Sequence, residues 1–297
     1  MTHTRIMVGP VEATTQEDEP LRMALLLWGD AGVGKTTWAA TAPGGKLWLS
    51  FGDQEHVPVA KRKDVTVANF SGTNYEEIFK HAQNDNPFGL DQILRDNEDI
   101  HTVVCDSVTA LSEGALHKAV SMRLGAGKGF TPTMEHPGLS AYGGRNAIVL
   151  EVLRGLLRVT AKHGVHLILT AHEADPEKDQ LTGENLFYTI MLGGKLVKNN
   201  THRLSEIWYM SLDGDRRSVA VRPTRKRRPM KTRMFSSRGP AEFQLDYDAE
   251  KPDAGQMTIA SFVDQWSSSN GKIMTPSRTG DVSQERPQPS LPRNRSK

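Results

Sequence analysis

A glycine-rich loop with a lysine and a threonine offers the clearest chemistry in this sequence. The apolar run 23–28 predicts a buried strand, and it leads directly into G-x-x-x-x-G-K-T. Glycines at these positions let backbone N–H groups turn inward around a polyphosphate, and the following helix adds the positive end of its dipole. The pattern therefore predicts a nucleotide site made of Gly29, Asp30, Ala31, Gly32, Val33, Gly34, Lys35, Thr36 and Thr37.

The site needs a lysine for the phosphates and oxygen ligands for a magnesium ion. Lys35 is placed to reach the β- and γ-phosphates, and the Thr36 hydroxyl is a Mg²⁺ ligand in this pattern. Asp106 follows the apolar strand 100–105, so its carboxylate can hold the same ion directly or through water. The alternative is that Asp106 caps the helix predicted from Val108. We expect ATP and Mg²⁺ as the cofactors.

Hydrolysis also requires a group that orients or deprotonates the attacking water. Glu55 follows the strand 46–51, and carboxyl ends of parallel strands gather at the ligand crevice. Asp53 is the rival candidate, and either residue is alternatively a solvated loop charge. His172 follows the strand 165–171, where it either senses the γ-phosphate or is simply a hydrogen-bonded histidine.

Strands and helices alternate from residue 21 onward. This order predicts an α/β fold with a mostly parallel sheet, helices on both faces and an antiparallel hairpin near the C-terminus. The expected strands are 46–51, 65–70, 100–105, 165–171, 206–212 and 218–222, and the expected helices are 36–42, 76–83, 108–124, 148–162 and 257–266. Residues 125–146 lack a regular period and predict a long loop.

The chain divides into three parts by composition. Residues 1–20 are polar and lack periodicity, which predicts a flexible arm. Residues 21–247 form the expected core. Residues 248–297 predict a short helix and a disordered tail rich in serine, proline and arginine.

Composition favours a cytoplasmic protein without a membrane partner. The one cysteine, Cys105, excludes an internal disulfide and lies in a predicted buried strand, where it is expected to be inert. No apolar run approaches the roughly 20 residues that span a bilayer, and residues 1–20 lack the apolar core of a signal peptide. The ten histidines are scattered and form no zinc pattern.

The net charge of +2 hides a local basic cluster. Such a cluster contacts phosphates in many proteins, although a solvated basic loop is the alternative. It contains Arg222, Arg225, Lys226, Arg227, Arg228, Lys231, Arg233 and Arg238. Two long loops on the crevice side, roughly 121–146 and 173–200, mix cations with aromatic rings, which suits single-stranded DNA. The candidate DNA-binding residues are Arg123, Lys128, Phe130, Tyr142, Arg145, Lys195 and Lys198.

The order of these motifs resembles the RecA-type recombinase core. The resemblance rests on the phosphate loop, on Asp53-x-Glu55-His56 and on the run V-V-C-D-S-V-T-A-L at 103–111. It is strongest to the short, phage-borne RecA-like ATPases, which include the Sak-type single-strand annealing proteins. Weaker matches are Tyr142-Gly143, the strand end 169–173, Gly194-Lys195 and the segment 230–233, so the likeness covers roughly 21–247.

The resemblance implies that ATP binds between neighbouring subunits of a ring or filament. Lys231 and Arg233 would then reach the γ-phosphate of the adjacent subunit, and the two long loops would bind DNA. His172 stands where RecA proper has a glutamine, and residues 173–200 do not clearly match its DNA-binding loop. Annealing or ATP-gated binding of single strands is therefore favoured over strand exchange.

The expected function is a DNA-stimulated ATPase that binds single-stranded DNA and promotes annealing or homologous recombination, in the host cytoplasm if a phage encodes it. The alternatives are an ATP-gated single-strand-binding protein that does not need turnover, and a helicase-type motor or loader. A small-molecule kinase ranks last, because it leaves the basic cluster unexplained. The tail either recruits a partner such as a single-strand-binding protein or is only a disordered terminus.

Overall fold

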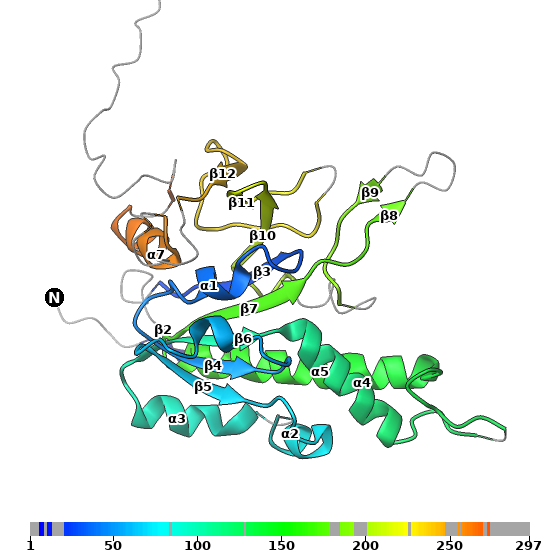
Figure 1. The fold of residues 1–297 in the computed structure, drawn as a ribbon. Coiled ribbons are helices and arrows are strands. Elements are labelled where there is room, and N and C mark those ends of the chain that lie inside the picture. The colour runs from blue at the N-terminus through cyan, green and yellow to red at the C-terminus, as the bar shows by residue number, and fades with distance from the viewer. Residues whose placement is uncertain are drawn as a thin grey trace, which may run out of the picture.

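An eight-stranded sheet forms the centre of the protein, with the strand order β12-β11-β10-β3-β7-β6-β4-β5 (Figure 1). The strands from β10 to β5 are parallel to one another, and β11 and β12 add antiparallel pairs. This arrangement confirms the predicted fold class. The strands are β3 (Ala24–Gly29), β4 (Gly45–Ser50), β5 (Val65–Asn69), β6 (Ile100–Asp106), β7 (His166–His172), β10 (Glu206–Asp213), β11 (Arg216–Ala220) and β12 (Glu242–Gln244).

The computed structural model describes residues 6–8, 11–13, 21–82, 85–127, 129–178, 185–192, 201–224, 227–246, 255, 257–269 and 272–273. Within these ranges, none of the helices combines the length and the apolar character that a bilayer crossing requires.

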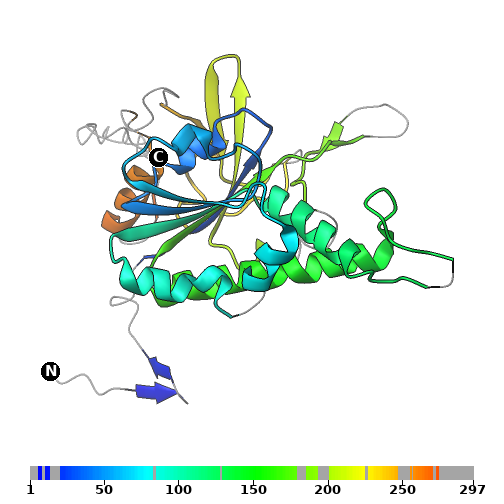
Figure 2. The ribbon, with the colours of Figure 1, turned by 60° about the horizontal axis from the view of Figure 1, so that its bottom comes forward.

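Helices cover both faces of the sheet, so its central strands are apolar on both sides. Every residue of β3 is buried, which explains why its sequence is a continuous apolar run without alternation. One face carries α2 (Tyr75–Ala82), α3 (Leu90–Asp96), α4 (Val108–Ser121) and α5 (Gly138–Lys162). The other carries α1 (Lys35–Ala39) and α7 (Ile259–Ser268) (Figures 1 and 2).

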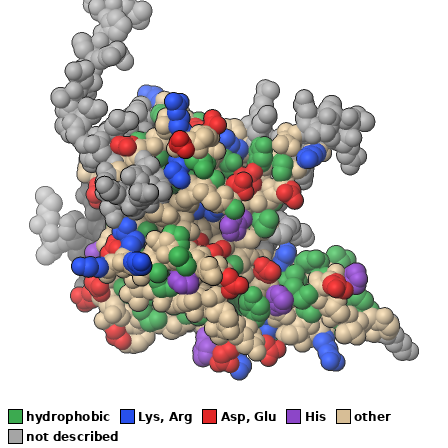
Figure 3. All heavy atoms as spheres, viewed as in Figure 1, with side chains coloured by type: hydrophobic (Ala, Val, Ile, Leu, Met, Phe, Trp, Pro, Cys, Tyr) green, Lys and Arg blue, Asp and Glu red, His purple; other side chains and the backbone are tan. Residues whose placement is uncertain are grey.

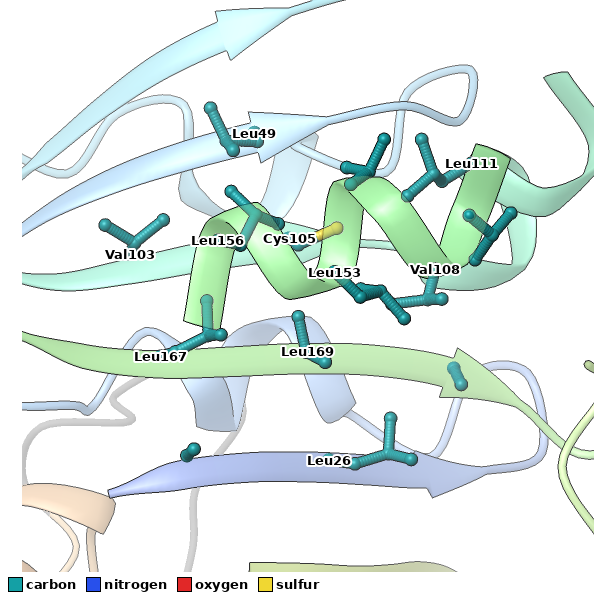
Figure 4. Packing of buried hydrophobic residues seen from close by; sticks show 14 of the residues in the cluster. Leu26, Leu49, Val103, Cys105, Val108, Leu111, Leu153, Leu156, Leu167 and Leu169 are labelled. Carbon is teal, nitrogen blue, oxygen red and sulfur yellow. The ribbon is translucent and has the colours of Figure 1, made fainter. Parts of the chain in front are cut away.

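The core under α5 is a close-packed aliphatic layer. Figure 4 shows Leu153 and Leu156 of this helix beside Leu169 and Cys105 of the sheet. Cys105 is fully buried, and burial raises the pKa of its thiol well above the usual value. The thiol is therefore protonated and inert, as the sequence predicts.

Helix α7 covers the other face of the sheet and packs against α1, the helix that follows the phosphate loop. Trp38 of α1 is fully buried against Trp208 and Phe262, and its indole N–H donates to the Met257 carbonyl at 3.1 Å. The backbone N–H of Ile259 donates to the hydroxyl of Thr41 at 3.0 Å. The C-terminal helix thus supports the loop from behind.

The prediction of a loop over 125–146 is wrong in its second half, because α5 already begins at Gly138. Gly143 and Gly144 weaken the helix signal in the sequence, since glycine lowers helix propensity. Packing overrides that preference. A Cβ at Gly144 would lie 2.3 Å from Leu124 Cδ1, so glycine allows α5 to approach Leu124 closely. Tyr142 and Arg145 are therefore held on a helix.

Smaller differences lie at element ends and in short elements. Helix α1 ends at Ala39, before the predicted end at residue 42, and α4 ends at Ser121. The sequence does not indicate α3, β12 or the pair β8 (Glu177–Lys178) and β9 (Asn185–Phe187). Within residues 1–20, predicted to be a flexible arm, β1 (Ile6–Val8) pairs with β2 (Val11–Ala13). Most of the predicted tail lies outside the described residues.

Strand β10 packs so closely on the start of the phosphate loop that only glycine fits at position 29. A Cβ on Gly29 would lie 2.1 Å from the Met210 carbonyl oxygen. We predict that Gly29→Ala lowers the free energy of unfolding by about 1–3 kcal/mol, because the two strands must separate. Urea unfolding followed by circular dichroism measures the change.

Gly143→Ala is the matched control, because a Cβ there meets nothing within 4 Å and alanine favours the helix. We expect this variant to be at least as stable as the wild type. Equal unfolding midpoints for Gly29→Ala and the wild type would contradict the prediction.

Candidate nucleotide site

The phosphate loop joins β3 to α1 at the carboxyl edge of the parallel strands. Gly32 and Gly34 have φ values of +76° and +98°, which glycine adopts without steric cost. Such a backbone turns successive N–H groups to one side and makes a concave site for an anion. This local geometry suits the phosphate binding that the motif predicts.

Lys35 lies inside this loop, with its Nζ donating to the carbonyls of Gly29 at 3.0 Å and Asp30 at 2.6 Å. Its side chain is only 6% exposed. Burial lowers the pKa of the Lys35 ammonium, and the charges of Asp106 and Asp30 oppose that shift. The cation is thus held next to the groups that the motif assigns to the phosphates and the metal.

The buried Asp106 and the half-buried Thr36 bring two candidate oxygen ligands together. The Thr36 hydroxyl donates to Asp106 Oδ2 at 2.9 Å, and the peptide bond from Asp106 to Ser107 is cis. Carboxylate and hydroxyl oxygens are the donors that Mg²⁺ prefers, so these two residues fit the ion. The capping alternative is wrong, because the Ser107 hydroxyl caps α4 by accepting from the N–H of Ala110.

Thr170 of β7 holds the other oxygen of the same carboxylate. Strand β7 lies between β3 and β6, and Cys105 pairs with Leu169, so the next residues, Asp106 and Thr170, are neighbours. The sequence does not single out Thr170, whose one signal is a hydroxyl in an apolar strand. Burial raises the pKa of Asp106 to about 6, against the lowering effect of the hydrogen bond from Thr170.

Glu55 faces the same site and is held by three groups. Ser107 Oγ donates to Glu55 Oε1 at 3.0 Å, the Gly52 N–H donates to Oε2 at 3.1 Å, and His172 Nε2 lies 3.5 Å from Oε1. Burial raises the pKa of Glu55, but the bonds from His172 and Ser107 outweigh it and leave that pKa lowered. Asp53 is exposed in the same turn, so the geometry favours Glu55 as the base.

Lys231 and Arg233 do not meet the phosphate loop of their own chain. Lys231 exchanges backbone hydrogen bonds with Ile207, near the start of β10, and its Nζ donates to the Leu204 carbonyl at 2.6 Å. Because β10 runs parallel to β3, this region lies at the amino edge of the sheet, opposite Gly29. Their contact with a neighbouring subunit stays a prediction.

A fully buried carboxylate, that of Glu206, shapes the segment that carries Arg233. It accepts hydrogen bonds from the backbone N–H groups of Arg233 at 2.8 Å and Met234 at 3.0 Å, and from the side chains of Thr232 and Trp208. Burial raises the pKa of Glu206, and these donors oppose the shift. The Arg233 side chain stays exposed. The sequence does not single out Glu206, whose one signal is an acid at the start of an apolar strand.

The candidate DNA-binding residues in the described part gather around α5 and the chain before it. The Arg145 guanidinium lies 5.1 Å from the centre of the Tyr142 ring. Phe130 and Tyr142 are exposed, and Arg123 is exposed with a positive φ. Figures 1 and 2 show α4 and α5 extending together past the sheet. Lys128, Lys195 and Lys198 lie outside the described residues.

The basic cluster at 222–238 is partly used within the chain. Arg222 donates to the carbonyls of Ser237 and Gly239, and Arg227 pairs with Glu242 at 2.8 Å. Arg228, Arg233 and Arg238 are exposed, whereas Arg225 and Lys226 lie outside the described residues. Acidic and basic side chains are interspersed on the face in Figure 3, so no single basic patch dominates that face.

The buried charge of Asp106 has a consequence for stability. Because the pKa of Asp106 is about 6 in the folded protein against 3.8 for an ordinary aspartate, ionised Asp106 destabilises the fold above pH 6, and the cost fades towards pH 4. We predict that, in EDTA, Asp106→Asn is more stable than the wild type at pH 8 by up to about 3 kcal/mol. Urea unfolding at pH 8 and pH 4 measures the difference, which should nearly vanish at pH 4.

The exposed Asp53 offers the matched control, and Asp53→Asn should change stability by less than about 0.5 kcal/mol at either pH. Adding Mg²⁺ with ADP should stabilise the wild type but not Asp106→Asn. A variant Asp106→Asn that is less stable than the wild type at pH 8 would contradict this account.

Comparison with known proteins identifies the family of this chain. A family model described as an AAA domain matches residues 21–234, which include the phosphate loop, Glu55, Asp106 and His172. The comparison with curated proteins finds no match. The family model covers most of the chain, and the matched part has the fold and the phosphate loop of a nucleotide-binding protein. The chain therefore belongs to the AAA domain family of P-loop ATPases.

Proposed function

We propose that this protein is an ATPase whose turnover is stimulated by single-stranded DNA and that it promotes annealing or homologous recombination. ATP binds between the subunits of a ring or filament in this proposal. The observation that carries it is the contact between Glu55 and His172, because it connects the candidate base with the strand end that leads into the predicted DNA-binding segment.

The hydrolysis site follows from the residues already described. Lys35 and the N–H groups of the loop bind the phosphates, while Thr36 and Asp106 hold Mg²⁺, which neutralises charge on the phosphates when bound. Glu55 accepts a proton from the attacking water, since its lowered pKa keeps it ionised at neutral pH. The bonds from Ser107 and Gly52 fix the direction of its carboxylate.

His172 joins this site to the segment that follows β7. Its ring contacts Glu55, and its backbone N–H donates to the Thr109 hydroxyl at 2.9 Å. Its carbonyl accepts from the N–H of Met191 at 2.8 Å, so the strand end and residue 191 are held together. A ligand that displaces this segment would therefore move His172 and with it the base.

A cavity of about 490 Å³ lies beside this junction, between α4, α5 and residues 189–192. Its lining combines the apolar Ile190 and Leu192 with the cationic Arg145, one of the candidate DNA-binding residues. Apolar surface next to a cation suits an unstacked base and its phosphate. The cavity therefore supports DNA binding at a place from which bound DNA would act on Glu55, the candidate catalytic base.

The positions of the cations support assembly in the proposal. The phosphate loop lies at the carboxyl edge of the sheet, and the exposed Arg233 lies on a segment at its amino edge. Head-to-tail packing of subunits brings such opposite surfaces together and produces a ring or a filament. Arg233 of one subunit then stabilises the charge that develops on the nucleotide of the next.

Turnover and its stimulation by DNA test the proposal directly. We predict that single-stranded DNA raises the ATPase rate at low salt and that Glu55→Gln lowers kcat at least about 100-fold, because the base is lost while the phosphate loop is intact. Phosphate release with and without DNA measures both effects. Asp53→Asn, two residues away and exposed, is the matched control and should keep wild-type kcat.

Absence of both DNA stimulation and salt-sensitive DNA binding in the wild type would overturn the proposal. If Glu55→Gln annealed complementary strands as well as the wild type, ATP would gate binding without a need for turnover.

Mixing experiments test the shared site. We predict that Arg233→Ala lowers kcat about 100-fold or more, whereas Arg238→Ala, at another exposed arginine of the basic cluster, does not. Mixing Arg233→Ala with Lys35→Ala protein should restore part of the activity, because an intact loop then meets an intact Arg233 from its neighbour. Activity that stays at the level of the separate variants after mixing would count against a site between subunits.

A further inference from the structure

The hairpin of β10 and β11 extends past the end of β3 and runs alongside the phosphate loop. Tyr209 of β10 pairs with Trp28, one residue before the loop begins, and the hairpin continues beyond that point to Asp213 and back. Arg217 pairs with Leu212 in this extended part. Figure 2 shows the hairpin in yellow, rising beside the blue loop and α1.

Arg217 touches the outer side of the loop at two neighbouring residues. Its Nε donates to the Val33 carbonyl at 3.1 Å, across 184 positions of sequence. A Cβ built on Gly34 would lie 3.1 Å from the same Nε, so the guanidinium lies on the side of this glycine where a side chain would stand. Met210 of the hairpin covers the same spot, with its Cε 3.5 Å from that Cβ position.

Because the peptide bond is planar, the contact of Arg217 outside the loop also sets the direction of an N–H group inside the loop. In a trans peptide, the carbonyl of one residue and the N–H of the next point in opposite directions. Because Arg217 holds the Val33 carbonyl outward, the N–H of Gly34 points away from Arg217, towards the concave side of the loop. That side is where the nest of N–H groups receives an anion.

Arginine suits this task better than a shorter polar residue. Its guanidinium is planar and always charged, so it donates in a fixed direction to a carbonyl while adding positive potential behind the loop. Gly34 complements it, since a side chain at φ +98° would be strained and its Cβ would lie within 3.1 Å of Arg217 Nε. The G-x-x-x-x-G-K-T pattern explains a glycine here but contains no residue of the hairpin.

We propose that Arg217 is a positioning residue of the nucleotide site, which holds the Val33–Gly34 peptide so that the Gly34 N–H faces the phosphates of a bound nucleotide. This inference rests on nucleotide binding by the loop and is independent of DNA binding. It extends the site from the phosphate loop to the β10–β11 hairpin.

Equilibrium binding of a fluorescent ADP analogue without DNA tests the role of Arg217 separately from turnover. Arg217→Ala should raise the Kd about fivefold, equivalent to about 1 kcal/mol for one hydrogen bond. Arg217→Lys keeps a charge and a donor on a flexible stem, so its Kd should lie between those of the wild type and Arg217→Ala. Arg216→Ala is the matched control, because Arg216 is exposed on the same strand, and it should keep the wild-type Kd.

Thermal unfolding separates positioning from a general effect on the fold. The melting temperature of Arg217→Ala without nucleotide should equal that of Arg216→Ala, while the rise on adding ADP should be smaller. A wild-type Kd for Arg217→Ala would overturn the inference and leave the proposed function standing. A wild-type protein that bound no nucleotide would overturn both. Should Arg217→Ala fail to fold, a wild-type Kd for Arg217→Lys would overturn the inference in its place.

Discussion

The buried carboxylate of Asp106 is the interaction on which the rest of the site depends. Thr36 at the end of the phosphate loop and Thr170 of β7 donate to its two oxygens. One charged group thus joins the loop, β6 and β7, which are far apart in sequence. Burial makes this charge costly, as its raised pKa shows. The order of the strands β3, β7 and β6 brings the two hydroxyls to the carboxylate, and the site is assembled by the sheet rather than by the loop alone.

The parallel sheet also separates two kinds of chemistry. Its carboxyl edge holds the phosphate loop, Asp106, Glu55 and His172, whereas the segment of Arg233 is anchored at its amino edge by the buried Glu206. A carboxylate with no water around it needs several donors, and here most of them come from the segment 232–234. These hydrogen bonds offset the cost of burying Glu206. They also fix the shape of the segment that exposes Arg233.

Much of the fold could be predicted from the sequence because its strands are apolar on both faces and its helices alternate with them. The core strands lie within one or two residues of their expected positions. The start of α5 could not be predicted, because Gly143 and Gly144 weaken the local helix signal while the contact with Leu124 favours the helix. Short elements such as α3 could not be predicted either, because they contain too few residues to show a clear hydrophobic period.

For the site, the sequence by itself determined the phosphate loop and the strand-end carboxylate, because their geometry follows from local backbone preferences and the end of a buried strand. It left Glu55 and Asp53 as rivals, and only the tertiary structure distinguishes their surroundings, because Glu55 contacts Ser107 and His172 whereas Asp53 is exposed. Thr170, Glu206 and Arg217 likewise became visible only in three dimensions. Each acts through a contact across strands or across a long stretch of chain, and such contacts depend on sheet order and register, which leave no pattern around the residue itself.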